Sequence, residues 1–247
     1  MIYIQSDTDR TLPHHFDAAC AMYGAIDSAM KYRLTPFEEV AEGNWDSLIR
    51  TNLFVGSVEF MREVFKRIGL DDVRLPMNSD REHEIITLGE AHERVAKGEK
   101  IFIKPIEIKL FTGLVLDGMI YASLANLPQD TKVMAYKPFD KKILSEWRIY
   151  VHNKKIVDAR NYSGDFMIIP IKSWLDKKIT SLDNFPCAYT IDVGLLESNG
   201  FDFEDSTYNV EPILIEFNDL WALGNYGMPN DLYLQLLQDR YFEIVKK

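Results

Sequence analysis

Three oxygen-bearing side chains interrupt two apolar runs near the C-terminal end of the sequence. Glu216 and Asn218 are two residues apart in PILIEFN, and Asp192 lies in the middle of AYTIDVGLL. Because side chains alternate along a strand, Ile215 and Phe217 are predicted to face a packed layer. Glu216 and Asn218 then project together from the other face, and pairing with a neighbouring strand can bring Asp192 beside them. Such hard oxygen ligands suit Mg²⁺, which also shares substrate phosphates. The alternative is that the carboxylates pair with basic residues at a sheet surface.

Two arginines lie on either side of a predicted hairpin, in EWRIYVH and IVDARNY. A three-residue loop of Asn153, Lys154 and Lys155 would set the opposed pairs Val151 and Val157, Ile149 and Ala159, and Arg148 and Arg160. Like charges at opposed positions destabilise a sheet unless an anion lies between them, and a phosphate-rich ligand would supply that anion. The alternative is that each arginine pairs with a separate carboxylate.

Two lysines stand in the run IFIKPIEIKLFTG, with Lys104 at the end of an apolar strand and Lys109 on the adjoining turn. A desolvated ammonium needs a partner, and phosphate oxygens are a natural one. The alternative is that Lys104 extends its amine to solvent from the strand end. The following Thr112 and Gly113 do not form the GxxxxGK[ST] loop of Walker-type sites.

The elements that must carry these residues begin with a small α/β segment. MIYIQS and TNLFVG are typical of strands, and a helix rich in small residues is expected from about residue 14 to 32, with Tyr23 and Met30 in the core. Ser57 is the expected N-cap of the next helix, which Gly69 ends.

Later elements follow from caps and alternation. Thr87 and Glu90 have the spacing of a capping box, and Gly98 stands past the last turn of that helix. Strands are expected at 101–105, 113–117 and 132–136, a helix near 171–182, and a terminal helix from about residue 230.

The composition limits the possible classes of protein. The 247 residues are 47% hydrophobic and 27% charged, which is typical of a globular chain. A formal net charge of -10 disfavours a nucleic-acid partner, which would need clustered Lys and Arg. Cys20 and Cys187 have no metal-site spacing, and no apolar run approaches the roughly 20 residues of a membrane helix. We therefore expect a cytoplasmic protein with no membrane association.

The ordered motifs IFIKP, SEWRIYV, DARNY, IDVGLL and IEFN together resemble the ATP-grasp superfamily, over most of residues 85–247. More narrowly, they are similar to the clade that is named for two arginines and a lysine and includes a eukaryotic translation assembly factor. The resemblance implies an α/β protein with α+β lobes: an N-terminal pre-ATP-grasp domain at 1–84, a small lobe at 85–143 and a large lobe at 144–247.

In that family ATP lies between the two lobes, and the resemblance implies a role for each motif residue. Lys104 and Lys109 would hold ATP phosphates, and Arg148 and Arg160 would contact phosphates and the developing acyl-phosphate charge. The metal ligands for one or two Mg²⁺ ions would be Asp192, Glu216 and Asn218. The adenine contacts would come from the backbone of Tyr136, Lys137 and Pro138. Glu146 also matches the clade pattern without an assigned role.

The implied activity is ATP-dependent ligation of a carboxylate to an amine or other nucleophile through an acyl phosphate. Such phosphoryl transfer depends on positioning and charge neutralisation, so no side-chain nucleophile is needed. The acceptor would be a small molecule, a peptide or a protein, selected by the first 84 residues and by the loop 220–228. Two alternatives stay open: an ATP-binding assembly factor or chaperone without turnover, and a phosphotransferase.

Overall fold

The computed structural model of the chain describes residues 1–71, 73, 75, 81–106, 110–119, 121–202 and 207–246. The chain forms two compact units, one of residues 1–79 with 143–247 and one of residues 80–142. The larger unit thus joins the first and last parts of the sequence. The division into three domains at 84 and 143 stays a prediction. None of the described helices has the length and apolar character needed to cross a lipid bilayer.

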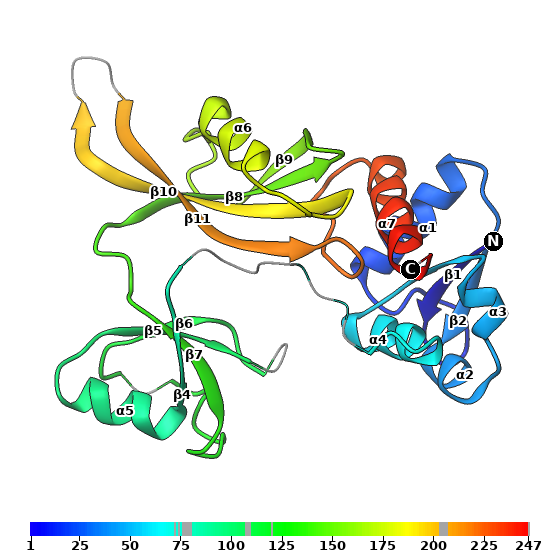
Figure 1. Ribbon diagram of the computed structural model, residues 1–247, viewed down its shortest axis with the longest axis horizontal. Coiled ribbons are helices and arrows are strands. Elements are labelled where there is room, and N and C mark those ends of the chain that lie inside the picture. Colours follow the sequence, from blue (N-terminus) through cyan, green and yellow to red (C-terminus); the bar gives the residue numbers. More distant parts are fainter. Residues whose placement is uncertain are drawn as a thin grey trace. The chain divides into compact units, whose positions relative to one another are not determined.

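The N-terminal part of the larger unit is a parallel sheet of order β2-β1-β3 (Figure 1). Its strands are β1 (Ile2–Ser6), β2 (Tyr32–Pro36) and β3 (Leu53–Val55), and its helices are α1 (Phe16–Asp27), α2 (Phe37–Glu42), α3 (Asp46–Ile49) and α4 (Val58–Arg67). The Ser57 side chain accepts a hydrogen bond from the Phe60 N–H, so the predicted N-cap is confirmed. Gly69 follows the helix at a φ of 79°, in the left-handed region.

The helix expected at about 14–32 is shorter than predicted, because α1 ends at Asp27. Tyr32, the last residue of the predicted range, instead begins β2. Ala29 adopts a φ of 54°, and the N–H groups of Ala29 and Met30 donate to the carbonyls of Ile26 and Ala25. This is the Schellman pattern that ends a helix. The sequence pattern missed β2 because it is an edge strand whose first two residues are exposed.

Helix α1 packs against the terminal helix α7 (Asn230–Val245) through its small residues. Ala18, Ala21, Gly24 and Ala25 are buried, and a Cβ on Gly24 would overlap the Asn230 carbonyl. The expectation that Tyr23 and Met30 are core residues is wrong, because both side chains are exposed. The close approach of the two helices requires the small residues to face inward and leaves the large ones outside.

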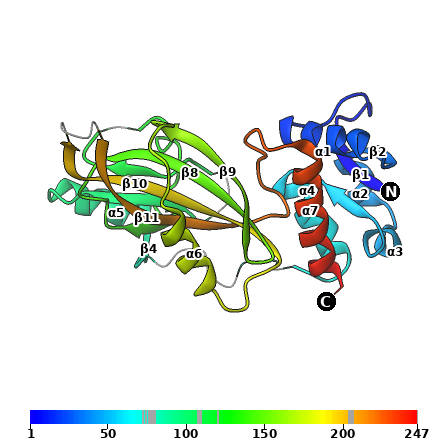
Figure 2. The ribbon, with the colours of Figure 1, turned by 90° about the horizontal axis from the view of Figure 1, so that it is seen from above.

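The C-terminal part of the larger unit is an antiparallel sheet of order β11-β10-β8-β9 (Figure 2). Its strands are β8 (Ile143–His152), β9 (Lys155–Gly164), β10 (Ala188–Asp202) and β11 (Thr207–Asp219). Helix α6 (Lys172–Thr180) covers one face, where Leu175 and Ile179 pack with Ile149, Ile191 and Phe217. Because side chains alternate along each strand, the residues between these apolar ones occupy the other face.

The β8–β9 hairpin has a two-residue turn, not the three-residue loop that the sequence suggested. Asn153 and Lys154 have φ values of 49° and 62°, as a type I′ turn requires, and His152 pairs with Lys155. The predicted pairing of Val151 with Val157 is therefore wrong, and Val151 pairs with Ile156. A bulge at Val157 restores the register, so Ile149 lies opposite Ala159 and Arg148 lies opposite Arg160, as predicted.

The smaller unit is a sheet of order β4-β7-β5-β6 with one helix among its described residues. Its strands are β4 (Glu84–Thr87), β5 (Ile101–Pro105), β6 (Leu114–Leu116) and β7 (Lys132–Tyr136). Helix α5 (Leu88–Ala96) begins with the predicted capping box of Thr87 and Glu90. Its Leu88 and Ala91 are buried in the same cluster as Ile103 and Val133. Lys104, which alternates with Ile103, is thereby placed on the opposite face.

Candidate functional site

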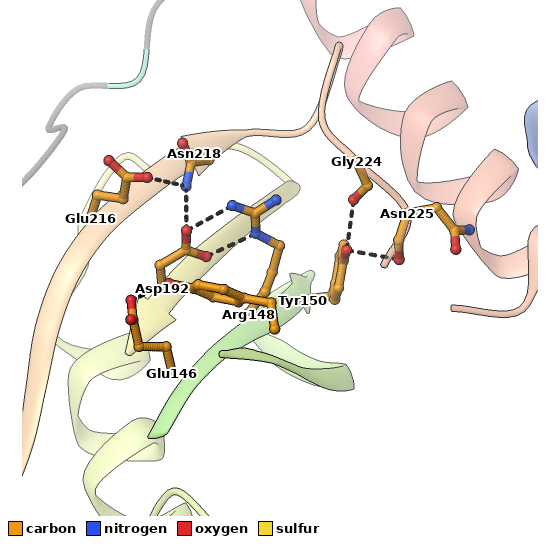
Figure 3. A network of polar contacts seen from close by, with 9 residues as sticks. Glu146, Arg148, Tyr150, Asp192, Glu216, Asn218, Gly224 and Asn225 are labelled. Carbon is orange, nitrogen blue, oxygen red and sulfur yellow. Dashed lines mark hydrogen bonds and ion pairs between the residues drawn. The ribbon is translucent and has the colours of Figure 1, made fainter. Parts of the chain in front are cut away.

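A row of four charged residues crosses the C-terminal sheet of the larger unit. Arg160 on β9 pairs with Arg148 on β8, Arg148 pairs with Asp192 on β10, and Asp192 pairs with Glu216 on β11. We call these four residues the charged row. The strands thus bring together all the predicted metal and arginine residues of this unit, with Asn218 two positions from Glu216 on β11. Figure 3 shows Arg148, Asp192, Glu216 and Asn218 side by side.

Arg148 and Asp192 form a buried, two-point ion pair at the centre of the charged row. Arg148 Nε donates to Asp192 Oδ1 at 2.8 Å, and Nη2 donates to Oδ2 at 2.7 Å. Burial opposes the charge of Arg148, but the hydrogen bonds and charge of Asp192 outweigh it and raise the pKa of the guanidinium. The guanidinium therefore stays charged, and Asp192 compensates it in a poorly hydrated place.

Arg160 has its own partner on the same strand. Its Nε and Nη2 donate to Asp158 Oδ2 at 3.0 Å and 2.7 Å. Of the two explanations for the opposed arginines, the structure therefore shows separate carboxylates, Asp192 for Arg148 and Asp158 for Arg160. The Arg160 pair is half-exposed, unlike the buried Arg148 pair. Arg160 can consequently change partners at a lower cost in desolvation.

Asn218 links the two carboxylates that were predicted to bind metal. Its Nδ2 donates to Asp192 Oδ2 at 3.1 Å and to Glu216 Oε1 at 3.3 Å. Turning the amide about its last bond would present the oxygen in place of the nitrogen. Two carboxylates and one amide are hard oxygen donors of the kind that suits Mg²⁺. Within the described part of the chain, no group of three His, Cys, Asp or Glu side chains could hold a metal ion.

A bulge on β11 corrects one expectation about this strand. Asp192 pairs with Glu216 but Val193 pairs with Leu214, so Ile215 is the extra residue. Leu214 and Phe217 lie in the apolar cluster under α6, whereas the Ile215 side chain lies beside Gly194. The prediction that Ile215 shares the packed face with Phe217 is therefore wrong. Glu216 and Asn218 nevertheless share the polar face, as predicted.

Two tyrosines that the sequence did not single out cover Arg148. Its guanidinium carbon lies 4.6 Å from the centre of the Tyr226 ring and 5.9 Å from that of Tyr162. The Tyr162 hydroxyl donates to Glu146 Oε2 at 3.1 Å, which gives Glu146 a defined contact. Burial and the charges of Asp192 and Glu146 raise the pKa of Tyr162, so this hydroxyl stays protonated. The electron-rich faces of the rings further favour the arginine cation.

The loop that carries Tyr226 is fixed at several points. The Tyr150 hydroxyl, on β8 beside the charged row, donates to the carbonyls of Gly224 and Asn225 at 2.7 Å and 3.0 Å (Figure 3). The Asn225 N–H donates to Asp17 Oδ1 on α1 at 2.8 Å. Tyr226 then adopts a φ of 50° and Gly227 a φ of 83°. The left-handed pair turns the chain sharply after Asn225, and Tyr226 contacts Arg148 from this turn.

The remaining predicted residues belong to the smaller unit. Lys104 is half-buried on β5, with its Nζ 6.0 Å from the centre of the Phe102 ring. Tyr136 ends β7 and is buried, and the exposed Lys137 lies near Asp140. Pro138 follows beyond the strand end, and Lys109 lies outside the described residues.

Arg81 is the most distinctive residue of this unit that sequence reasoning missed. Its guanidinium carbon lies 4.0, 5.0 and 5.8 Å from the ring centres of Phe139, Tyr136 and Phe102. Its Nη2 donates to the Lys137 carbonyl at 2.7 Å. Arg81 thereby holds the strand end that was predicted to contact adenine. The sequence offered no signal for it, because Arg81 is far from all three rings along the chain.

Comparison with known proteins supports an assignment of fold and family. No protein of curated function matches the sequence significantly. Solved structures do match, among them that of an ATP-grasp ligase, PsnB, complexed with minimal precursor. The two share 10% sequence identity with a TM-score of 0.50, and the match covers 97% of this chain and 98% of that one. A D-alanine–D-alanine ligase from Bacillus anthracis complexed with ATP also matches (11% identity, TM-score 0.50, 99% of this chain and 97% of that one). At such identities the likeness shows the fold.

A family model identifies the relationship more directly. Residues 79–236 match an ATP-grasp domain family, the second family of the clade named for two arginines and a lysine. This match spans more than half of the chain. The chain therefore belongs to the ATP-grasp superfamily and to this clade, as the ordered motifs indicated.

Proposed function

We propose that this ATP-grasp protein is a Mg²⁺-ATP-dependent ligase that joins a carboxylate to an amine or another nucleophile. The charged row carries the proposal, because it places two arginines, two carboxylates and, with Asn218, an amide on one face of a single sheet. Phosphoryl transfer is catalysed by positioning and by neutralising charge, and these residue types serve both tasks.

The metal would be held by Asp192, Glu216 and Asn218. A carboxylate offers about four lone-pair sites, so Asp192 can accept from Arg148 and still ligate a cation. The Arg148 contact also fixes the orientation of the Asp192 carboxylate before metal arrives. Bound Mg²⁺ would supply charge neutralisation at the nucleotide phosphates.

The two arginines would serve the phosphates in different ways. The pair with Asp192 uses Nε and Nη2 of Arg148, so Nη1 can donate to a phosphate oxygen without breaking it. Arg160 lies in the next strand and holds Asp158 in a half-exposed pair. It can therefore exchange this carboxylate for a phosphate as charge develops. Tyr226 and Tyr162 keep the Arg148 guanidinium in place from the side of their rings.

The smaller unit would bind the rest of the nucleotide. Lys104, together with Lys109, is proposed to neutralise phosphate charge, and the backbone of Tyr136, Lys137 and Pro138 to contact adenine. Arg81 supports this assignment indirectly, because it packs on the Tyr136 ring and binds the Lys137 carbonyl. The backbone of residues 136–138 is thereby held in one conformation before nucleotide binds.

The reaction would proceed in two displacements. An acceptor carboxylate oxygen attacks the γ-phosphorus, the bond to the bridging oxygen breaks, and ADP leaves. The amine nitrogen then attacks the acyl carbon, the C–O bond to phosphate breaks, and the amine loses a proton. A peptide or protein acceptor is part of the proposal because one structure of the same fold was solved with a precursor.

Product analysis tests this function. The parent, Glu216→Gln and the control Asp176→Asn are incubated with Mg²⁺-ATP, hydroxylamine as the nucleophile, and a panel of amino acids and acidic peptides as carboxylates. Asp176 is an exposed residue of α6 that pairs with Lys172. The proposal expects ADP and a hydroxamate from the parent and the control, and neither from Glu216→Gln. A stable phosphorylated product would indicate a phosphotransferase. ATP-dependent retention of a protein from cell extract, without any product, would indicate an assembly factor.

A further inference from the structure

One hydroxyl group on the polar face of the C-terminal sheet is buried and unpartnered among the residues that the structure describes. Thr190, on β10, is 0% exposed, and its Oγ1 has no hydrogen-bond partner in that part of the chain. Tyr189 and Ile191, its neighbours along the strand, belong to the apolar cluster under α6, so Thr190 faces the other side together with Asp192. An unpartnered buried hydroxyl lowers the free energy of unfolding, so stability does not explain a threonine here.

The register of the sheet places this hydroxyl beside Asn218. Thr190 on β10 pairs with Asn218 on β11, just as Asp192 pairs with Glu216 two residues further along. Side chains that are opposed in this way have Cβ atoms about 4.5–5.5 Å apart. On its other side Thr190 pairs with Tyr150 of β8, whose hydroxyl is engaged with the loop that follows β11. Asn218 is therefore the opposed neighbour whose polar group can change partners.

The Asn218 amide faces the two carboxylates of the charged row with its nitrogen. Nδ2 donates to Asp192 Oδ2 at 3.1 Å and to Glu216 Oε1 at 3.3 Å (Figure 3). A cation is ligated by the amide oxygen, so metal binding requires the amide to turn over about its last bond. Nδ2 then leaves both carboxylates. This half-buried donor needs a new acceptor, because a donor that is left without one costs free energy.

We propose that Thr190 is a positioning residue, whose Oγ1 accepts a hydrogen bond from Asn218 Nδ2 when the amide turns its oxygen toward a bound divalent cation. This inference rests on the proposed function, because it requires that Asn218 ligates Mg²⁺ together with Asp192 and Glu216. Thr190 is fully buried, so it acts through Asn218 and does not itself contact the cation. One turn of the amide gives both the nitrogen and the unpartnered hydroxyl a hydrogen bond.

The hydrogen bonds of Asn218 explain why such an acceptor matters for metal affinity. Without a cation, Nδ2 serves two carboxylates on neighbouring strands. A divalent cation neutralises both carboxylates, but the loss of the two hydrogen bonds from Nδ2 opposes its binding. A new hydrogen bond to Thr190 offsets part of that loss. Because the hydroxyl gains its partner only in the metal-bound arrangement, it favours that arrangement without changing the ligands.

Titration of the full chain with Mn²⁺ in the presence of ADP tests the proposal, because the paramagnetic resonance signal of the free ion reports binding without turnover. Thr190→Val keeps the shape of the side chain and removes the hydroxyl, and it should weaken Mn²⁺ binding about fivefold, as expected for one neutral hydrogen bond. Thr190→Ser keeps the hydroxyl and should bind like the parent. The control Thr35→Val removes the hydroxyl of an equally buried threonine on β2 and should also bind like the parent.

The outcomes separate this role from the metal site on which it rests. Parent-like binding by Thr190→Val, or equal losses in Thr190→Val and Thr190→Ser, would overturn the positioning role and leave the metal site standing. Absence of Mn²⁺ binding to the folded parent would overturn both.

Two further measurements show whether Thr190 acts through Asn218. In the Asn218→Ala background, Thr190→Val should weaken Mn²⁺ binding no further, and additive losses would overturn the proposal. Urea unfolding without metal should give a higher midpoint for Thr190→Val than for the parent, because the variant no longer buries an unpartnered hydroxyl. A threonine that served stability alone would give a lower midpoint, and that result would also overturn the proposal.

Discussion

Arg148 and Asp192 lie directly opposite each other on β8 and β10 and form a buried pair through two hydrogen bonds. The residue predicted to bind phosphate thus holds the residue predicted to bind metal. The two hydrogen bonds fix the orientation of both side chains. The proposed site is therefore organised by protein contacts alone, before any nucleotide or metal would bind.

Asp192→Asn should destabilise the protein by about 3–5 kcal/mol, because it leaves the buried Arg148 cation uncompensated. Urea unfolding measures the change in free energy. The control Asp176→Asn removes an exposed partner of Lys172 and should cost less than about 1 kcal/mol. An apolar double variant, Arg148→Met with Asp192→Leu, should recover much of the loss. Equal stability of Asp192→Asn and the parent would contradict the role of the pair.

Tyr226→Leu should lower the free energy of unfolding by about 0.5–2 kcal/mol through loss of the ring face over Arg148. Tyr226→Phe keeps the ring and should differ little from the parent, since the cation contacts the ring face. In the product assay, Tyr226→Leu should also slow ADP formation because Arg148 is held less firmly. The same loss in Tyr226→Phe would show that the hydroxyl, not the ring, carries the effect.

Cys187 should react slowly with iodoacetamide. Burial and the Glu243 carboxylate raise the pKa of its thiol to about 12, so at pH 9 about one thiol in a thousand is ionised. Glu243→Gln removes the negative charge, which lowers the pKa and should speed alkylation of this cysteine at pH 9. Peptide mapping distinguishes Cys187 from Cys20. An alkylation rate unchanged by Glu243→Gln would mean that burial alone protects the thiol.

Arg81→Met should loosen the end of β7 in the smaller unit. The variant loses the contact with the Lys137 carbonyl and the cation over the Phe139 and Tyr136 rings. Hydrogen exchange at the backbone around residues 136–139 should accelerate at least tenfold. Arg94→Met, which removes a cation paired with Glu99 elsewhere in the same unit, is the matched control. Unchanged exchange at 136–139 in Arg81→Met would exclude this role.

The sequence predicted those features that depend on local pattern. Ser57 and the Thr87–Glu90 capping box are local, and every described strand except β2 and β4 was predicted from its apolar pattern. Arg148 was placed opposite Arg160 correctly even though the turn was assigned one residue too long, because the bulge at Val157 compensates. The turn predicted one residue too long and the unpredicted bulge shift the register in opposite directions, so the pairs beyond the bulge are as predicted.

What could not be predicted depends on contacts between distant segments. The covering of Arg148 by Tyr226 joins a loop to a strand that lies far before it in the sequence. The rings around Arg81 likewise come from separate strands and turns. Tyr23 and Met30 were assigned to the core because apolar residues usually belong there. Because α7 approaches α1 closely at Gly24, the face of α1 with small residues is the buried one, and Tyr23 lies on the exposed face.

The most direct test of the account is calorimetric titration of Mg²⁺-ATP into the parent, Glu216→Gln, Lys104→Ala and the control Asp176→Asn, after each is shown to be folded. We predict binding to the parent and the control, and at least tenfold weaker binding, about 1.4 kcal/mol, for the other two. Chelation of Mg²⁺ should weaken binding to the parent but change little in Glu216→Gln. Absence of binding to the folded parent, or parent-like, Mg²⁺-dependent binding to Glu216→Gln, would contradict the assignment of the charged row.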